Sequence, residues 1–587
     1  MKLSNYVIDF LASEGITHVF EIGGGAITHL LDSMYERKDI SAVSMHHEMA
    51  AAIAAEGYSR VSGNIGIAMA TSGPGATNLI TGIGSCFFDS IPCLFITGQV
   101  NTYEFKFDRP VRQVGFQETD IVNIVRPIVK DAVLVTEPDK IRYYLEKAVS
   151  IARSSRPGPV LLDIPMNVQR ADINPESLES FYKGTANKSV NGVNDAVVKQ
   201  VAQLIKASSR PVVLAGGGIR LSKGQDELLK FVSKTGIPVV TSLMGLDSFP
   251  HNNSLFSGMI GSYGNRYANL TVANSDLVLA LGTRLDTRQT GTKPETFARE
   301  AKIIHVDIDM FELNSKVKAD VSVNCDVKRF LGILNNYINS RKKNKRQSWG
   351  KIIRRYKDRY PSYRAPASDI IEPNFFMHKL SEFIPENAII CVDVGQSQMW
   401  AAQSLEVKKS QRFLTQGGMG SMGSALAMGI GASFANPDKV VVVISGDGGF
   451  QLNIQELQTL RYHNLPIKVI LLNNCCYGMV KQFQEQYFNS RFQSTVIGYS
   501  CPNFQDVVAA YKIPGIKITR YTDMVKAVQK LFSGMEPMFL EANINPEAKV
   551  MPKLSVNKPV EDQDPPLPRD ELKSNMLIDL LPDDGEK

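Results

Sequence analysis

Two short polar segments, each directly after an aliphatic run, carry residue types that bind metal ions. The segment GDGG (446–449) follows the run 439–444, and Asn473 and Asn474 follow the run 467–472. Carboxylate and amide oxygens are the ligands that a hard cation such as Mg²⁺ prefers, and glycines let the backbone approach a phosphate closely. Asp447, Asn474 and the backbone carbonyl of Cys476 are therefore candidate ligands of a cation that also holds a phosphate.

A strand–helix–strand unit would bring these two segments together. The two aliphatic runs have the length of buried strands, and residues 452–462 have apolar side chains at helical spacing. A crossover of this kind places the ends of two neighbouring parallel strands side by side. Either segment alone is compatible with an ordinary turn or loop. Together, at positions 447 and 474, they indicate a site for a metal ion and a diphosphate.

The alternation of short strands and helices occurs three times along the chain. It predicts an α/β fold with three doubly wound parallel sheets, in which ligands bind at the carboxyl ends of the strands. We expect domains at 1–182, 190–340 and 370–550, followed by a proline-rich, acidic tail at 551–587. A polar linker (184–189) and a basic run (341–346) mark the boundaries. The predicted strands include Ile65–Ala70, Cys93–Thr97, Val160–Ile164, Val212–Ala215, Val239–Thr241, Leu277–Leu281, Ile303–Asp307, Ile389–Val392, Val440–Ile444 and Lys468–Leu472.

The composition is that of a globular protein, with 43% hydrophobic and 21% charged residues among 587. The net charge of +6 is small for this length, and we interpret the basic run 341–346 as a solvated linker rather than a nucleic-acid site. The seven cysteines form no CxxC pair and are expected to be reduced thiols. Without a signal peptide or an apolar stretch of about 18 residues, we expect a cytoplasmic protein with no membrane partner.

Five longer segments carry a resemblance to a known family. They are HHEMAAAIAAEGYSR (46–60), TSGPGATNLITGI (71–83), VDVGQSQMWAAQ (392–403), QGGMGSMGSALAMGIGA (416–432) and GDGGFQLNIQELQTLRYHNLPIKVILLNN (446–474). All five resemble the thiamine-diphosphate enzymes, and in particular the catalytic subunits of acetolactate synthases. The resemblance covers roughly residues 1–550, and the tail beyond does not match.

The resemblance implies thiamine diphosphate held through Mg²⁺, with a glutamate against the pyrimidine ring of the cofactor. Glu48 fits that role, because it begins an alanine-rich helix where little water would reach it and burial raises the pKa of a carboxyl group. The alternative is a carboxylate that merely stabilises the start of its helix. By resemblance, Gly25 would line the reactive carbon, and the alternative is the glycine loop of a dinucleotide-binding fold. Phe116 and Gln117 would lie beside the substrate, unless they are packing residues in a surface loop.

The resemblance also implies a set of cofactor-binding residues and an oligomer. Glu48 and the metal-binding segment come from different chains in the family, which implies a homodimer or tetramer. Met422 would support the bent cofactor, or else be a core methionine. The implied cofactor-binding residues are Gly395, Gln396, Ser397, Gly420, Met422, Gly446, Asp447, Gly448, Gly449, Asn474, Tyr477, Gly478 and Met479.

The middle unit resembles the flavin-binding domain of acetolactate synthases. Gly217 and Gly218 follow a predicted strand, Arg284 and Arg288 lie in a second strand-end segment, and Asp307 ends a third strand. Glycines at a strand end and a nearby arginine suit a pyrophosphate. FAD in a structural role is therefore expected, and an empty, degenerate domain is the alternative.

Several departures from the family surround the expected substrate. Met166 replaces a lysine, Phe483 a tryptophan and Thr287 an aspartate, while in the diphosphate-binding loop Ser397 replaces a histidine. We therefore expect a carboligase that decarboxylates pyruvate, or a close 2-oxo acid, and transfers the two-carbon acetyl unit to a carbonyl acceptor. The acceptor could be a second pyruvate or a keto-sugar nucleotide of surface-polysaccharide synthesis. A non-catalytic cofactor-binding homologue is a further alternative, whereas the lack of a GxGxxG loop with its acidic partner argues against a nicotinamide dehydrogenase.

Overall fold

The computed structural model describes residues 1–182, 193–338 and 346–582, which group into two compact units. Unit 1 contains residues 1–188, 387–398 and 414–543, and unit 2 contains residues 189–386, 399–413 and 544–587. The expected linker at 184–189 and most of the basic run at 341–346 lie outside the described residues. The chain contains three six-stranded sheets and one two-stranded sheet among the described residues. In that part of the chain no helix is long and apolar enough to cross a membrane.

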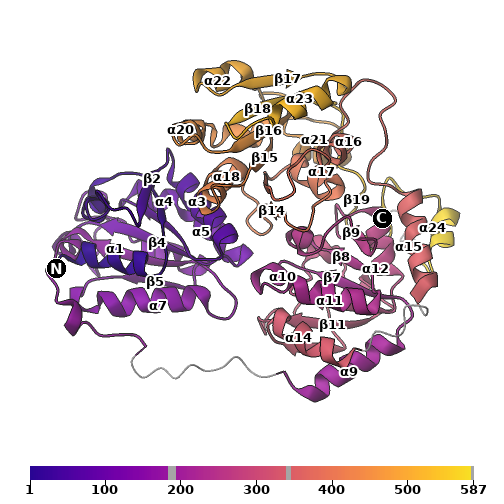
Figure 1. The fold of residues 1–587 in the computed structure, drawn as a ribbon, viewed down its shortest axis with the longest axis horizontal. Coiled ribbons are helices and arrows are strands. Elements are labelled where there is room, and N and C mark those ends of the chain that lie inside the picture. Colours follow the sequence, from indigo (N-terminus) through magenta and orange to yellow (C-terminus); the bar gives the residue numbers. More distant parts are fainter. Residues whose placement is uncertain (183–192, 339–345, 583–587) are drawn as a thin grey trace. The chain divides into compact units, whose positions relative to one another are not determined.

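The N-terminal sheet of unit 1 has the strand order β2-β1-β3-β4-β6-β5, and its strands run parallel. Helices α1 and α7 pack on one face, and α3 and α5 pack on the other (Figure 1). The strands are β1 His18–Glu21, β2 Ser41–Ser44, β3 Gly66–Ala70, β4 Cys93–Gln99, β5 Asp131–Leu134 and β6 Val160–Pro165. The helices are α1 Leu3–Ser13, α2 Thr28–Asp32, α3 Glu48–Ser62, α4 Pro74–Asn78, α5 Ile80–Asp89, α6 Ile121–Val125, α7 Ile141–Arg153 and α8 Met166–Gln169.

The second sheet of unit 1 contains the predicted metal-binding segments. Its order is β14-β13-β15-β16-β18-β17, and β15 pairs in parallel with both β13 and β16. The strands are β13 Ile389–Val392, β14 Arg412–Leu414, β15 Val441–Gly446, β16 Ile467–Asn473, β17 Gly515–Ile518 and β18 Met538–Asn543. The helices are α17 Gln396–Ser404, of which residues 399–404 belong to unit 2, α18 Ser424–Ala435, α19 Asp447–Gln451, α20 Leu457–Tyr462, α21 Gly478–Tyr487, α22 Phe504–Ala510 and α23 Met524–Leu531.

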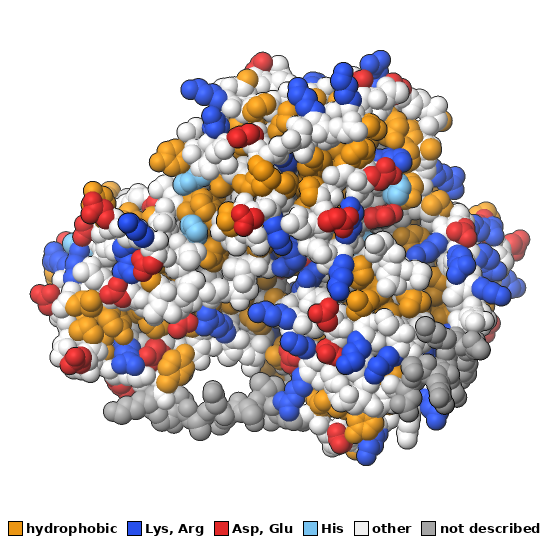
Figure 2. All heavy atoms as spheres, viewed as in Figure 1, with side chains coloured by type: hydrophobic (Ala, Val, Ile, Leu, Met, Phe, Trp, Pro, Cys, Tyr) orange, Lys and Arg blue, Asp and Glu red, His pale blue; other side chains and the backbone are white. Residues whose placement is uncertain are grey.

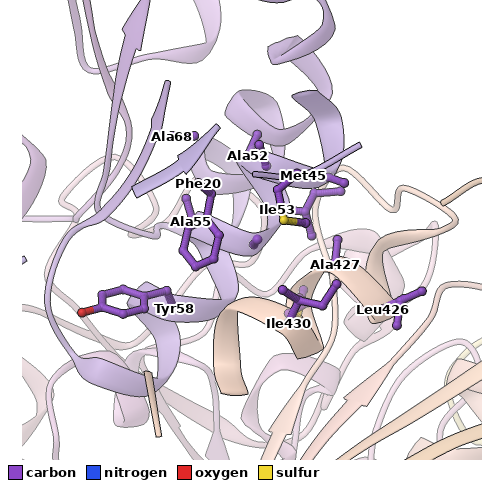
Figure 3. Close-up of a cluster of buried hydrophobic side chains, with 14 of the residues drawn as sticks. Phe20, Met45, Ala52, Ile53, Ala55, Tyr58, Ala68, Leu426, Ala427 and Ile430 are labelled. Atoms are coloured by element: carbon purple, nitrogen blue, oxygen red, sulfur yellow. The ribbon is translucent and has the colours of Figure 1, made fainter. Parts of the chain in front are cut away.

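Helices α3 and α18 join the two sheets of unit 1 through one apolar core. The side chain of His47 accepts a hydrogen bond from the backbone of Met49 and caps the start of α3, and Gly63 ends α3 in the left-handed conformation. Residues 50–55 of α3 are fully buried. Figure 3 shows Ala52, Ile53 and Ala55 of α3 in the same cluster as Leu426, Ala427 and Ile430 of α18. Small side chains on both helices permit this close approach.

Unit 2 is built on a sheet of order β12-β11-β10-β7-β8-β9, with helices on both faces. The strands are β7 Pro211–Ala215, β8 Val239–Thr241, β9 Phe256–Met259, β10 Leu277–Leu281, β11 Lys302–Asp307 and β12 Val321–Asn324. The helices before the tail are α9 Asp195–Ala207, α10 Gly218–Leu221, α11 Gln225–Thr235, α12 Arg266–Ala273, α13 Thr287–Thr290, α14 Val327–Tyr337, α15 Gln347–Arg359 and α16 Pro373–Leu380.

The tail completes one apolar core of unit 2 instead of extending into solvent. It forms the hairpin of β19 Lys553–Leu554 and β20 Gln563–Asp564, and then helix α24 Arg569–Asn575. Leu572 and Met576 pack with α12 and α15 in a single cluster. The outer face of α15 carries exposed lysine and arginine side chains (Figure 2), while Trp349, Ile353 and Tyr356 of the same helix are buried. Helix α15 is thus amphipathic, with a basic, solvated face.

The predicted fold class is confirmed, because three parallel α/β sheets are present and the predicted strands lie within one or two residues of β3, β4, β6, β7, β8, β10, β11, β13, β15 and β16. The prediction of one helix was wrong. The expected crossover helix over 452–462 is interrupted: α19 begins directly at Asp447, a short 3₁₀ turn follows at Ile454–Glu456, and α20 begins only at Leu457. The glycines after Asp447 turn the chain into a helix immediately at the end of β15, so that Asp447 occupies the first helical position.

Candidate active site

Three oxygen atoms meet at the carboxyl ends of β15 and β16. Asn474 Oδ1 lies 3.2 Å from Asp447 Oδ1 and 3.2 Å from the carbonyl oxygen of Cys476. Asn474 Nδ2 points away and donates to Gln396 Oε1 at 3.0 Å. Reversing the amide would satisfy the first two oxygens but would point the Asn474 oxygen at Oε1 of Gln396. Ligands at adjacent corners of a Mg²⁺ octahedron lie about 3 Å apart, so this oxygen cluster fits a hard cation.

The oxygen cluster consists of one carboxylate oxygen, one amide oxygen and one backbone carbonyl oxygen. Among the described residues no group of three or more His, Cys, Asp and Glu side chains forms a metal site, so the oxygen cluster is the candidate. Asp447 is buried, and this burial raises the pKa of its carboxyl group to about 6, although a hydrogen bond from Tyr499 acts in the opposite direction. A cation beside Asp447 would favour the charged carboxylate.

The residues expected to hold the diphosphate lie around this cluster. A Cβ added to Gly478 would overlap Gln396, and one added to Gly448 would overlap the ring of Tyr477. Ser397 Oγ lies 3.9 Å from the Cβ position of Gly446, and 3.9 Å from that of Gly395. The structure therefore brings together the ends of β13, β15 and β16 with the start of α21. Met479 is half-buried on that helix.

The loop before α18 presents Gly420 and Met422. Both are half-buried, and Gly420 has a φ of +69°, which a glycine adopts without strain. Apart from its neighbours in the chain, no atom of the described residues lies within 4 Å of a Cβ added to Gly420, so the space beside it is open. The beginning of the loop is fixed to α3 and α5 by Gln416 Nε2, which donates to Glu56 at 3.1 Å, and by the backbone N–H of Gly418, which donates to Asp89 at 2.8 Å.

Glu48 and the glycine segment 24–26 lie around the turn that follows β3. Asn78 Nδ2 donates to Glu48 Oε2 at 2.9 Å, and Thr71 Oγ1 accepts from the backbone of Ala26 at 3.1 Å. Gly25 is exposed, with open space around its Cβ position. The expectation that little water reaches Glu48 was wrong for the single chain, because Glu48 is half-buried. The alanines that follow pack against α18, whereas Glu48 precedes that contact.

Gln117 reaches the same turn, and Phe116 does not pack on the protein. Gln117 has a φ of +63°, and its Cβ lies 3.0 Å from the Cβ position of Gly73. Phe116 is 87% exposed. Buried Glu118 fixes this loop by accepting from the backbone N–H groups of Lys106 (2.7 Å) and Val114 (2.6 Å). Glu48, Gly25 and Gln117 therefore lie around one turn, while Phe116 projects into solvent.

The glycines of unit 2 pack closely together at the carboxyl ends of two strands of its sheet. A Cβ on Gly218 would approach the backbone of Gly282 to 2.7 Å, and one on Gly217 would lie 3.3 Å from Met244. Asp307 is buried at the end of β11. Arg284 pairs with Asp286 at 3.3 Å, and exposed Arg288 lies over the ring of Tyr263. The buried atoms Thr241 Oγ1 and His305 Nδ1 have no hydrogen-bond partner among the residues that the structure describes.

Comparison with known proteins decides the family. The thiamine pyrophosphate enzyme models match residues 1–124 (N-terminal TPP binding domain), 198–334 (central domain) and 393–542 (C-terminal TPP binding domain). The chain is 38% identical over 566 residues to acetolactate synthase 2, chloroplastic, of Nicotiana tabacum and to acetolactate synthase, chloroplastic, of Arabidopsis thaliana, covering 94% of this chain and 83% of each relative. It is 34% identical over 562 residues to the acetolactate synthase large subunit of Cyanidium caldarium, covering 94% of both. This chain belongs to the thiamine-diphosphate enzymes.

Within that family, it is an acetolactate synthase-like carboligase. The resemblance predicted from the sequence segments is confirmed. Three of the four positions that were expected to depart from the family are partly or largely exposed: Met166 is half-buried at the start of α8, Phe483 on α21 is 47% exposed, and Thr287 is exposed at the start of α13. Ser397 is buried beside the oxygen cluster and donates to the carbonyl of Asp393 at 3.3 Å.

Sequence reasoning missed two side chains of this carboligase, Asp393 and Tyr499. Asp393 directly follows β13 and accepts from the backbone of Gly423 and Ser424 at 3.1 Å and from Ser445 Oγ at 2.8 Å. It thereby fixes the start of α18 to the end of β15, and burial raises its pKa. An aspartate that directly follows a buried aliphatic strand was the available signal. Nothing local in the sequence marks Tyr499, which donates to Asp447.

Proposed function

We propose that this enzyme decarboxylates pyruvate and transfers the acetyl unit to a second pyruvate, forming 2-acetolactate. The sequence similarity to acetolactate synthases over 94% of the chain supports the substrate. The three facing oxygens of Asp447, Asn474 and Cys476 are the structural observation that carries the proposal, because such a cluster suits Mg²⁺ and Mg²⁺ suits a diphosphate. Thiamine diphosphate, when bound, supplies the nucleophilic carbon that the side chains lack.

The proposed roles of the protein groups follow from their positions. Asp447, Asn474 and the Cys476 carbonyl would hold Mg²⁺. The segments around Gly395, Gly448 and Gly478 would hold the diphosphate. Glu48 would hold a proton at N1′ of the pyrimidine ring, and Gln117 and Gly25 would border the substrate. Exposed Phe116 would close the substrate side only after a rearrangement of its loop or contact with a partner chain.

We propose further that each site is shared by two chains of a homodimer or tetramer. Gly57 of α3 lies against Met428 of α18, and Ala54 lies against Gly431, so the two helices run antiparallel. Glu56 of α3 binds the loop before α18, whereas Glu48 lies eight residues earlier, about 12 Å away along the helix. Glu48 therefore lies at the end of α3 that is remote from Gly420 and Met422 of the same chain. A second copy of the chain would supply the Gly420 and Met422 that complete the site with Glu48.

We propose that unit 2 binds FAD in a structural role. The close approach of Gly218 to Gly282 leaves a backbone edge without side chains, as a pyrophosphate requires. Thr241 Oγ1 and His305 Nδ1 are buried polar atoms without a hydrogen-bond partner among the described residues, and a bound cofactor could supply one. Arg284 would pair with the pyrophosphate after leaving Asp286. Flavin fluorescence in the supernatant of denatured, desalted protein would support this proposal, and a colourless supernatant would contradict it.

We also propose a reducing location such as the cytoplasm. All seven cysteines lie in the described part of the chain and are free thiols, including the neighbouring pair Cys86 and Cys93. Cell fractionation followed by alkylation of the thiols tests this point.

The assay for the function uses pyruvate alone. Formation of CO₂ and 2-acetolactate, dependent on both thiamine diphosphate and Mg²⁺, is the expected result. The half-exposed Phe483 and the apolar Met166 favour a larger second acceptor, such as a keto-sugar nucleotide. CO₂ release that becomes rapid only after addition of such an acceptor would replace the pyruvate proposal with this alternative. Binding of the cofactor without CO₂ release from any simple 2-oxo acid would favour a non-catalytic homologue.

A further inference from the structure

The segment 492–501, which follows α21, packs on the loop that carries Asn474 and Cys476. The backbone N–H of Tyr477 donates to the carbonyl of Thr495 at 3.1 Å. The rings of Tyr477 and Tyr499 meet edge to face with centroids 4.6 Å apart, and the sulfur atoms of Cys475 and Cys501 are 3.4 Å apart. These contacts fix the position of Tyr499 relative to the oxygen cluster.

Tyr499 directs its hydroxyl at the carboxylate of Asp447. The hydroxyl oxygen lies 2.6 Å from Asp447 Oδ2. Gln451 Nε2 donates to the same hydroxyl at 3.4 Å, so the hydroxyl hydrogen is left to point at Asp447. A hydroxyl at this distance from a carboxylate forms a charge-assisted hydrogen bond, which is stronger than a neutral one.

The two carboxylate oxygens of Asp447 therefore have different partners. Oδ2 is held by Tyr499, and Oδ1 faces Asn474, whose amide oxygen also lies 3.2 Å from the carbonyl oxygen of Cys476. Rotation of the carboxylate about its Cβ–Cγ bond would break the hydrogen bond and turn Oδ1 away from the other oxygens. Groups that hold a metal ligand in this way commonly change metal affinity when they are removed.

We propose that Tyr499 is a positioning residue that sets the affinity of the Mg²⁺ site through Asp447. The inference rests on the proposed Mg²⁺ function of the oxygen cluster. It assigns to the segment 492–501 a role in metal binding, although no residue of that segment is a ligand.

Tyr499→Phe is the decisive variant, because it removes the hydroxyl and keeps the ring that packs on Tyr477. The matched control is Tyr511→Phe, since Tyr511 is half-buried in the same unit and packs on its apolar core. Metal-free protein with saturating thiamine diphosphate is titrated with MgCl₂ in a calorimeter. We expect the Kd for Mg²⁺ to rise about 10- to 100-fold in Tyr499→Phe and to stay within twofold in Tyr511→Phe.

Two further measurements separate positioning from a general loss of structure. The increase in Tm caused by Mg²⁺, taken relative to the metal-free Tm of each variant, should shrink in Tyr499→Phe alone. Saturating Mg²⁺ should restore kcat, because the reacting groups are unchanged. A rise in Kd of less than fivefold in Tyr499→Phe would overturn the inference. If the unaltered protein itself fails to bind Mg²⁺, the proposed function fails instead.

Discussion

Gly57 of α3 and Met428 of α18 approach so closely that a Cβ on Gly57 would overlap the carbonyl oxygen of Met428. The contact is reciprocal, because a Cβ on Gly431 would overlap the carbonyl of Ala54. Two glycines on different helices thus permit backbone-to-backbone packing at the centre of unit 1. This crossing sets the position of the helix that begins with Glu48 relative to the helix that follows the Gly420–Met422 loop.

Gly57→Ala should destabilise unit 1 by about 1–3 kcal/mol, because the added methyl group meets fixed backbone. Gly332→Ala is the matched control: Gly332 lies within helix α14 with nothing within 4 Å of its Cβ position, so alanine there should be neutral or stabilising. Differential scanning calorimetry resolves the two effects. Equal transitions for both variants would show that the crossing relaxes at no cost.

Glu48→Gln should lower kcat by at least about a hundredfold while the fold remains intact, since glutamine cannot exchange a proton with the cofactor. Glu137→Gln changes an exposed glutamate of the same unit that pairs only with Lys140 among its described ionic contacts, and it should leave kcat unchanged. Circular dichroism checks the fold of each variant. Retained turnover in Glu48→Gln would remove Glu48 from the mechanism.

Co-expression of Glu48→Gln with Asp447→Asn should restore activity if two chains build each site. Random pairing yields mixed dimers with one intact site each, so about a quarter of the activity is expected. Each variant alone should be inactive. If the mixture stays inactive, Glu48 and Asp447 of one chain serve the same site.

Asp163 should make the stability of unit 1 depend on pH. It is buried and accepts hydrogen bonds from Thr97 at 2.7 Å and Gln99 at 2.9 Å, and burial raises its pKa to about 7 from 3.8. An acid whose pKa is raised by folding stabilises the protein fully below its unfolded pKa, and that stability is lost as the pH rises through its folded pKa. The loss therefore occurs between about pH 4 and pH 7 and amounts to a few kcal/mol.

Asp163→Asn should remove this dependence. Its Tm relative to the unaltered protein should increase progressively from pH 4 to pH 7 and then level off. Asp139→Asn, at an exposed position of the same unit, should follow the unaltered protein at every pH. Parallel Tm curves for Asp163→Asn and the unaltered protein would contradict the assignment.

Leu572→Ala should destabilise unit 2 by about 2–5 kcal/mol, because the tail helix α24 is part of its core. Leu572 is 1% exposed, whereas Leu577, five residues later, is 43% exposed. Leu577→Ala is therefore a control of identical chemistry, and it should change the Tm little. Similar Tm values for the two variants would mean that α24 contributes no stability.

The sequence was sufficient where one local pattern determines the outcome. Continuous aliphatic runs predicted β15 and β16, and parallel pairing placed Asp447 and Asn474 at one edge. The sequence was insufficient where contacts between segments far apart in the chain determine the structure. The hydroxyl of Tyr499 reaches Asp447 across 52 positions, and no period or composition reports such a contact. The half-exposure of Glu48 likewise depends on where α18 stops covering α3, which the alanine-rich pattern of α3 cannot reveal.

Because the chain is synthesised from its N-terminus, α3 is made well before α18, the helix that packs on it. Met428 is made 371 residues after Gly57, which at about 5–20 residues per second takes roughly 20–70 s. During this interval the alanine face of α3 exists without the helix that covers it. Transiently exposed apolar surface of this kind makes a folding intermediate prone to aggregation. The crossing that joins the two sheets of unit 1 in the finished protein therefore leaves one of its helices uncovered during synthesis.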